Sequence, residues 1–139
     1  MMINFKGTNR QLLNLYRGLE GVKDIKGSRF AVLVGKNMKE IKHILNPIEE
    51  AARPSPAFQT VSIQMRDLME ADDKEAMTQL EEDNKNLIEE RQEQMQRVED
   101  MLESDTEIKL HGVREDQLPE DITGEQVEKI LEIITNGDD

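Results

Sequence analysis

The chain has 139 residues, with 18 Lys and Arg against 30 Asp and Glu, so its net charge is −12. It has no Cys, which excludes a disulfide scaffold and thiol catalysis. Its N-terminus lacks the apolar segment of a signal peptide, and no apolar run approaches the roughly 18 residues that span a membrane, so we expect neither export nor membrane insertion.

Residues 1–27 are predicted to form a short strand followed by a short helix. Ile3 and Phe5 alternate with polar residues, which is typical of a strand. Thr8 is a candidate N-cap for a helix that runs to about Leu19, because leucines recur at helical spacing after it.

Residues 28–53 have the clearest helical pattern in the sequence. Apolar residues recur every three or four positions and form a seam along one side of the predicted helix. Asn37 interrupts this seam, and it is either solvated or part of a buried polar pair that determines register or oligomeric state. Because the start of the segment is rich in β-branched residues, a strand over 30–34 remains an alternative. The seam residues are Phe30, Val34, Asn37, Ile41 and Ile44.

A proline break separates this helix from the acidic part of the chain. Pro54 and Pro56 end it, and a short helix is predicted within residues 54–71. Residues 72–104 contain no Gly or Pro and are dense in strong helix formers, which predicts one long acidic helix. Its narrow seam, with polar interruptions, consists of Leu80, Asn84, Leu87, Arg91 and Val98.

Residues 105–136 are predicted to form a second strand and a closing helix. Ile108 and Leu110 alternate with polar residues, and this strand would pair with the N-terminal one because a lone strand leaves backbone groups unsatisfied. Thr123 followed by Gln126 is a capping box that begins the last helix.

The fold class is therefore mainly α, with a long antiparallel helical hairpin, short N- and C-terminal helices and a minor two-stranded β element. We expect a single domain over residues 1–139. The hairpin joins the helices of 28–53 and 72–104, because the acidic helix has too narrow an apolar stripe to be stable alone. The longer helix would overhang by about 10 Å, and another chain could cover it, so we expect a homo-oligomer.

Charge is distributed unevenly along the chain. Residues 1–65 have a net charge of +5, residues 66–107 of −11 and residues 108–139 of −6. The two halves of opposite sign could pack on each other. Alternatively, the acidic surface could bind a basic partner or imitate nucleic acid.

Catalytic chemistry has little support in the sequence. The Ser residues lie in no nucleophile motif, and neither His43 nor His111 has the spacing of a metal ligand. Glu89, Glu90 and Glu93 could hold Mg²⁺ in a metal-dependent all-α nucleotide hydrolase only with a second acidic pair on a neighbouring helix. We expect a protein that is not an enzyme and has no catalytic residues, metal or cofactor, with the hydrolase as an alternative.

Basic side chains of the N-terminal half are candidates for binding a small anion. A second alternative is that the protein sequesters a small nucleotide signal at a subunit junction, which needs cationic groups there. The candidate ligand-binding residues are Arg10, Arg17, Lys36 and Lys39. Because the chain is so acidic overall, we expect no direct nucleic-acid binding.

The order of several segments resembles a family of small tailed-phage proteins of unknown function. These segments are Lys-Gly-Ser-Arg-Phe-Ala at 26–31, Lys-Asn-Met-Lys at 36–39, the strand at 108–110 and Leu-Pro-Glu-Asp-Ile-Thr at 118–123. The resemblance implies a phage accessory protein, located in the cytoplasm of the infected bacterial host or in the virion. It carries over no functional residues.

These observations predict a non-enzymatic protein that acts by binding a host or phage protein. It is either a virion or assembly component, which packs its long helix against other phage proteins, or an inhibitor of a host protein or defence system. We expect no membrane contact.

Overall fold

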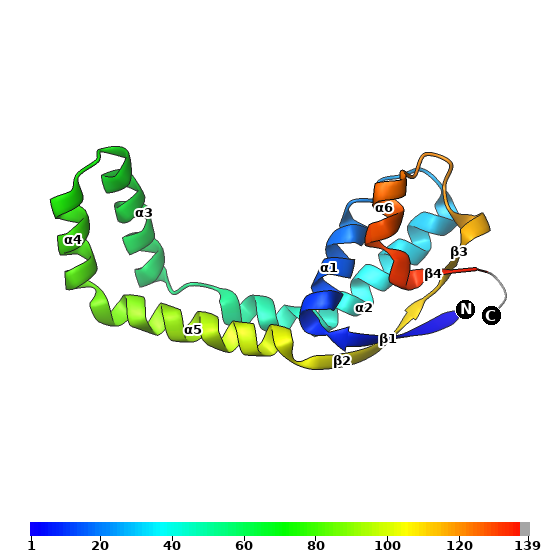
Figure 1. Cartoon of the computed structure of the whole chain (residues 1–139), viewed down its shortest axis with the longest axis horizontal. Coiled ribbons are helices and arrows are strands. Elements are labelled where there is room, and N and C mark those ends of the chain that lie inside the picture. The colour runs from blue at the N-terminus through cyan, green and yellow to red at the C-terminus, as the bar shows by residue number, and fades with distance from the viewer. Residues whose placement is uncertain (137–139) are drawn as a thin grey trace. The chain divides into compact units, whose positions relative to one another are not determined.

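The computed structural model describes residues 1–136, and this part of the chain is mainly helical (Figure 1). Six α-helices and a small antiparallel sheet confirm the predicted fold class at this level. The helices and strands in chain order are β1 (Met2–Thr8), α1 (Asn9–Glu20), α2 (Ser28–Ala52), α3 (Pro56–Glu70), α4 (Lys74–Asp83), α5 (Lys85–Glu103), β2 (Asp105–His111), β3 (Val113–Arg114), α6 (Gly124–Lys129) and β4 (Ile134–Thr135).

The chain forms two compact units. Unit 1 contains Met1–Pro47 and the chain from Met101 onward, and unit 2 is Ile48–Asp100. Helices α2 and α5 each contribute residues to both units. The single domain and the long antiparallel hairpin stay predictions.

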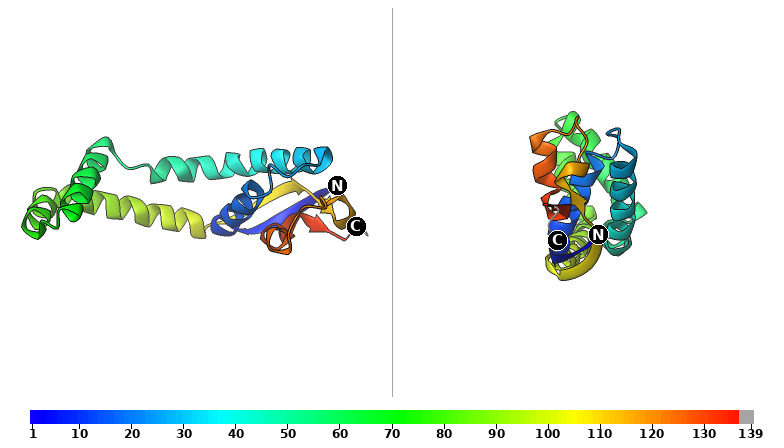
Figure 2. Two further views of the ribbon diagram at one scale, coloured as in Figure 1. Left: turned by 90° about the horizontal axis from the view of Figure 1, so that it is seen from above. Right: turned by 90° about the vertical axis from the view of Figure 1, so that its right-hand side faces the viewer.

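Unit 1 is built on a β-ribbon covered by helices (Figure 2). Strands β1 and β2 pair antiparallel, with Ile3 opposite Leu110 and Phe5 opposite Ile108, which confirms the predicted strand pair. Helix α1 follows β1 directly because Thr8 caps it: its side chain accepts a hydrogen bond from the backbone N–H of Gln11. Helix α1 packs against β1 on one side and against α6.

Residues 28–52 form a helix, so the alternative of a strand over 30–34 is wrong. The buried side of α2 carries Phe30, Val34 and Ile41, which pack in the core of unit 1. These residues recur at the helical period, so a helix places them on one side and buries them together. This periodicity outweighs the preference of the individual β-branched residues for strands. The helix continues through Pro47 to Ala52, one residue short of the predicted range of 28–53.

Residues 72–104 do not form one helix, which corrects the prediction. The acidic segment is divided into α4 and α5 at Asn84, whose backbone has φ −120° and ψ 24°. The Asn84 side chain donates a hydrogen bond to the carbonyl of Leu80 at 2.9 Å and thus ends α4. Asparagine side chains compete in this way with the backbone hydrogen bonds of a helix. The prediction counted helix-forming residues and therefore missed this local hydrogen bond.

The closing helix is shorter than the predicted 123–136. The predicted capping box of Thr123 and Gln126 is present and begins α6, but α6 ends at Lys129. A 3-10 turn follows over Leu131–Ile133, and β4 then pairs parallel with β3. The pairing of β3 with β4, which are distant in the sequence, therefore replaces the last turns of the predicted closing helix.

Candidate functional site

Unit 2 contains a helical hairpin with a well-marked start to each helix. The Ser55 side chain accepts a hydrogen bond from the backbone N–H of Phe58 at 3.1 Å, and Pro56 occupies the first turn of α3. Asp73 caps α4 in the same way, by accepting from the N–H of Ala76. Between the two helices Asp72 has a positive φ of 53°, which turns the chain so that α4 packs against α3.

Two polar residues of α5 bind the end of α2: Arg91, which belongs to the predicted seam, and Gln94. Arg91 donates to the carbonyl of Ala52 at 2.7 Å, and Gln94 donates to the carbonyls of Ala51 and Arg53, each at 2.7 Å. The last carbonyls of a helix have no partner within the helix, so these side chains act as caps. The sequence indicated a polar interruption at Arg91, but it did not indicate that the carbonyl of Ala52 is its partner.

The same arginine also contacts the beginning of α3. The Arg91 guanidinium lies over the ring of Phe58, 5.6 Å from its centroid, and its Nη1 donates a hydrogen bond to the side-chain oxygen of Gln94 at 2.9 Å. Cation–π contact of this kind orients an aromatic ring. Phe58 is therefore held in place where it lines the groove described next.

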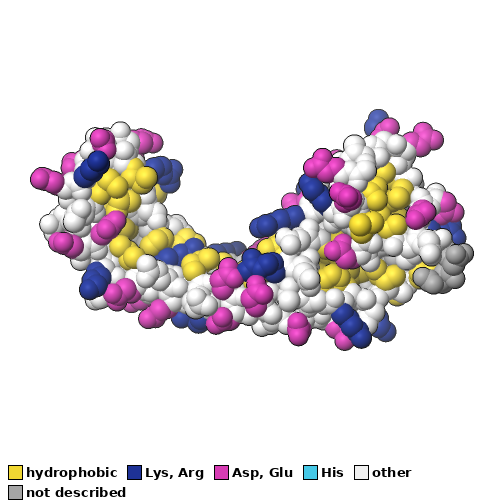
Figure 3. All heavy atoms as spheres, in the orientation of Figure 1, with side chains coloured by type: hydrophobic (Ala, Val, Ile, Leu, Met, Phe, Trp, Pro, Cys, Tyr) yellow, Lys and Arg dark blue, Asp and Glu magenta, His cyan; other side chains and the backbone are white. Residues whose placement is uncertain are grey.

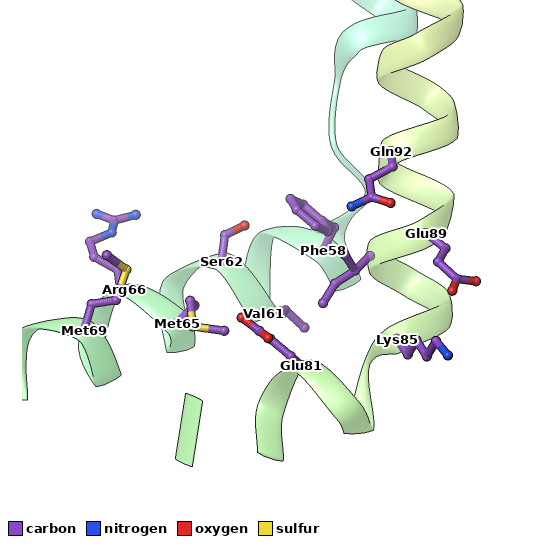
Figure 4. A pocket seen from close by; sticks show the side chains of 11 residues that line it. Phe58, Val61, Ser62, Met65, Arg66, Met69, Glu81, Lys85, Glu89 and Gln92 are labelled. Carbon is purple, nitrogen blue, oxygen red and sulfur yellow. The ribbon is translucent and has the colours of Figure 1, made fainter. Parts of the chain in front are cut away.

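An apolar groove with a volume of about 650 Å³ lies between α3 and the start of α5 (Figure 4). Its lining on α3 follows the helical period, and Ile88 faces it from α5. Met69 is 62% exposed, and Figure 3 shows apolar side chains gathered in this part of the surface. The lining residues are Phe58, Val61, Ser62, Met65, Arg66, Met69, Glu81, Lys85, Ile88, Glu89 and Gln92.

Apart from Val61, the residues that line the groove lie outside the core of unit 2. Within this unit, all of which the structure describes, the buried hydrophobic residues are Ile48, Val61 and Val98. Met65 and Ile88 are only half-buried. Apolar side chains that gather in a hollow and stay accessible mark an interaction surface more often than scattered exposed residues do.

Charged side chains line the edges of the groove. Arg66 lies on the α3 side, Glu81 on α4, and Lys85 and Glu89 on α5 (Figure 4). No ion pair within 4.0 Å joins any of these four to another side chain among residues 1–136. They are exposed, so their charges are available to a ligand.

Asn37 is one of the predicted seam residues, and it is fully buried in unit 1. Its side chain donates to the carbonyl of His111 at 2.9 Å and accepts from the His111 N–H at 2.7 Å. Asn37 is therefore not solvated, and its partner is the backbone at the end of β2. A role of this residue in setting register or oligomeric state stays a prediction. Of the other seam residues, Val98 is buried, and Ile44, Leu80 and Leu87 are half-buried.

The candidate anion-binding residues stay a prediction. Arg10 forms an ion pair with Glu103, with its Nε 2.8 Å from the carboxylate. Arg17 and Lys39 are exposed, and Lys36 lines a shallow hollow on the surface of α2.

Glu89, Glu90 and Glu93 are exposed on α5. Among residues 1–136, no group of three or more His, Asp or Glu side chains is placed to hold a metal ion. In the same range, none of the helices combines the length and apolar character needed to cross a membrane.

No protein-family model matches the sequence, and comparisons with curated proteins and with solved structures also return no match.

Proposed function

We propose that the protein is a non-enzymatic accessory protein that binds a helical segment of another protein in the groove of unit 2. The observation that carries this proposal is the accessible apolar lining from Phe58 to Met69 along α3, in a unit that buries only three hydrophobic residues. A groove between helices with an apolar floor is a common receptor for an amphipathic helix.

The dimensions of the groove fit a short helix. The apolar positions on α3 extend from Phe58 to Met69, which corresponds to about 16 Å at about 1.5 Å per residue. A partner helix of about three turns covers that length. It would place apolar side chains at positions i, i+3 or i+4, and i+7 against the groove.

Hydrophobic burial supplies the free energy of this association. Each partner side chain of leucine size that becomes buried contributes about 1.5–3 kcal/mol. Three such anchors contribute about 4.5–9 kcal/mol in total. Set against an association cost of about 4 kcal/mol, at the low end of its range, this leaves a weak, submillimolar affinity. Met65 and Met69 add adaptability, because unbranched thioether side chains fill irregular gaps.

The resemblance to small tailed-phage proteins gives this proposal its biological setting. In that setting the bound helix belongs to a phage structural protein or to a host protein that the phage inhibits. Self-association through the groove, to give the expected homo-oligomer, is the competing arrangement, and it predicts a mass above that of a 16.0 kDa monomer.

Selection of helical peptides tests the proposal. A displayed library of amphipathic peptides is selected on the full chain, and the enriched peptides are then titrated against two variants. Met65→Glu places a charge in the groove, whereas Ile63→Glu changes a residue of α3 that is 53% exposed and does not line the groove. We expect Met65→Glu to abolish binding and Ile63→Glu to preserve it, with circular dichroism showing that both variants fold. Equal binding by the two variants, or no enriched peptide, would refute the proposal.

A further inference from the structure

Unit 2 carries most of the negative charge of the protein. Its 53 residues contain 15 Asp and Glu against six Lys and Arg, a net charge of −9 out of −12 for the whole chain. At physiological ionic strength a charge acts over a Debye length of about 8 Å, so a ligand in the groove senses the charges of this unit first.

The cations of unit 2 compensate this charge only partly at the groove. Arg91 is directed inward, toward the carbonyl of Ala52 and the ring of Phe58. Arg66 and Lys85 remain on the edges together with Glu81 and Glu89, so the charges of these four side chains sum to zero. The surplus comes from the surrounding acids of α3, α4 and α5, which makes the field over the groove negative.

From this charge distribution we infer that the partner is a cationic amphipathic helix, with an apolar face for the groove and Lys or Arg on its flanks. This inference rests on the proposed function and specifies the partner. Glu81 and Glu89 are its specificity-determining residues, because they are exposed, lack an ion-pair partner among residues 1–136, and lie on the α4 and α5 side of the groove.

The same charge argues against a second copy of unit 2 as the occupant. Two copies of unit 2, each with a net charge of −9, repel each other, and like charges brought together at an interface oppose association. A basic helix of another protein is instead attracted by the negative charge of unit 2.

Two synthetic peptides distinguish charge recognition from apolar recognition. Both are three-turn helices with the same leucine face; one has lysines on its flanks and its twin has glutamates there. With the wild-type chain in low salt, we expect the cationic peptide to bind about tenfold more tightly than its twin, and the difference to shrink at high salt.

Reversing the charges of Glu81 and Glu89 tests whether these two residues cause the preference for the cationic peptide. The double variant Glu81→Lys, Glu89→Lys should lose the preference for the cationic peptide. A matched control, Glu120→Lys with Glu128→Lys, changes the net charge equally in unit 1 and should keep it, because both residues are exposed outside unit 2.

Each result decides between the alternatives. Equal affinity of the two peptides overturns the inference about charge but leaves the groove as a binding site, provided that Met65→Glu still abolishes binding. Loss of the preference in the unit 1 control overturns the role of Glu81 and Glu89. If neither peptide binds, or if the peptides merely dissociate a dimer of the protein, both the inference and the proposed function fail.

Discussion

Replacing Asn37 with Leu should destabilise unit 1. In a coiled-coil seam this change removes a buried polar group and raises stability. Here the Asn37 side chain is fully buried and forms two hydrogen bonds with the backbone of His111, at 2.9 and 2.7 Å. Leucine would leave both backbone groups without a partner.

The expected loss follows from these two contacts. A buried backbone group that loses its hydrogen-bond partner costs about 1–3 kcal/mol. His111 is half-buried, so water reaches part of it and the lower half of the range applies to each group. The sum is about 2–4 kcal/mol, a large part of the 5–15 kcal/mol that typically stabilises a domain. The melting temperature should fall by about 10 °C.

Two measurements check this prediction. Thermal unfolding followed by circular dichroism gives the change in melting temperature, with Lys36→Ala as a control on the exposed side of the same helix. Hydrogen exchange reports the His111 amide itself, whose protection should fall by about 100-fold in Asn37→Leu. An unchanged or higher melting temperature together with a protected His111 amide would show that the pairing contributes nothing.

Three further substitutions probe the contacts that hold each unit together. Gly18→Ala places a Cβ 2.5 Å from the carbonyl oxygen of Lys129, so α1 and α6 must separate, and urea unfolding should show a loss of about 1–3 kcal/mol. Gln94→Ala leaves two carbonyls at the end of α2 without their side-chain donor; we expect a loss of about 1–2 kcal/mol, and an unchanged urea midpoint would mean that water replaces the cap. Thr8→Ala removes the N-cap of α1 and should cost about 1 kcal/mol, which Thr8→Ser should largely restore in the same assay.

Local signals in the sequence predicted several elements correctly. Thr8 and Thr123 each precede a glutamine by three positions, and both begin a helix with a capping box. The alternation around Ile3 and Phe5 predicted a strand, and its pairing with the strand of Ile108 is confirmed. These patterns succeed because caps and side-chain alternation depend on residues that are close in the chain.

Other features depend on a partner that is distant in the sequence. Asn84 and Arg91 look alike as polar interruptions of an acidic seam, yet Asn84 ends a helix by binding Leu80, whereas Arg91 caps the end of α2. The groove was likewise not predicted, because its two sides come from α3 and α5 and the intervening α4 sets their separation. The spacing of Phe58, Val61 and Met65 could have indicated an apolar face, but not that the face stays accessible.

Three properties could be predicted from the amino-acid sequence: the chain is mainly helical, its negative charge is concentrated in the middle, and most helices begin at recognisable residues. Three others depend on the packed structure: which polar groups are buried, where the acidic segment is interrupted, and that one apolar face of unit 2 remains open. The difference arises because propensity, capping and periodicity act within a few residues along the chain. Burial and hydrogen-bond partners depend on which distant segments come together, such as Asn37 with His111.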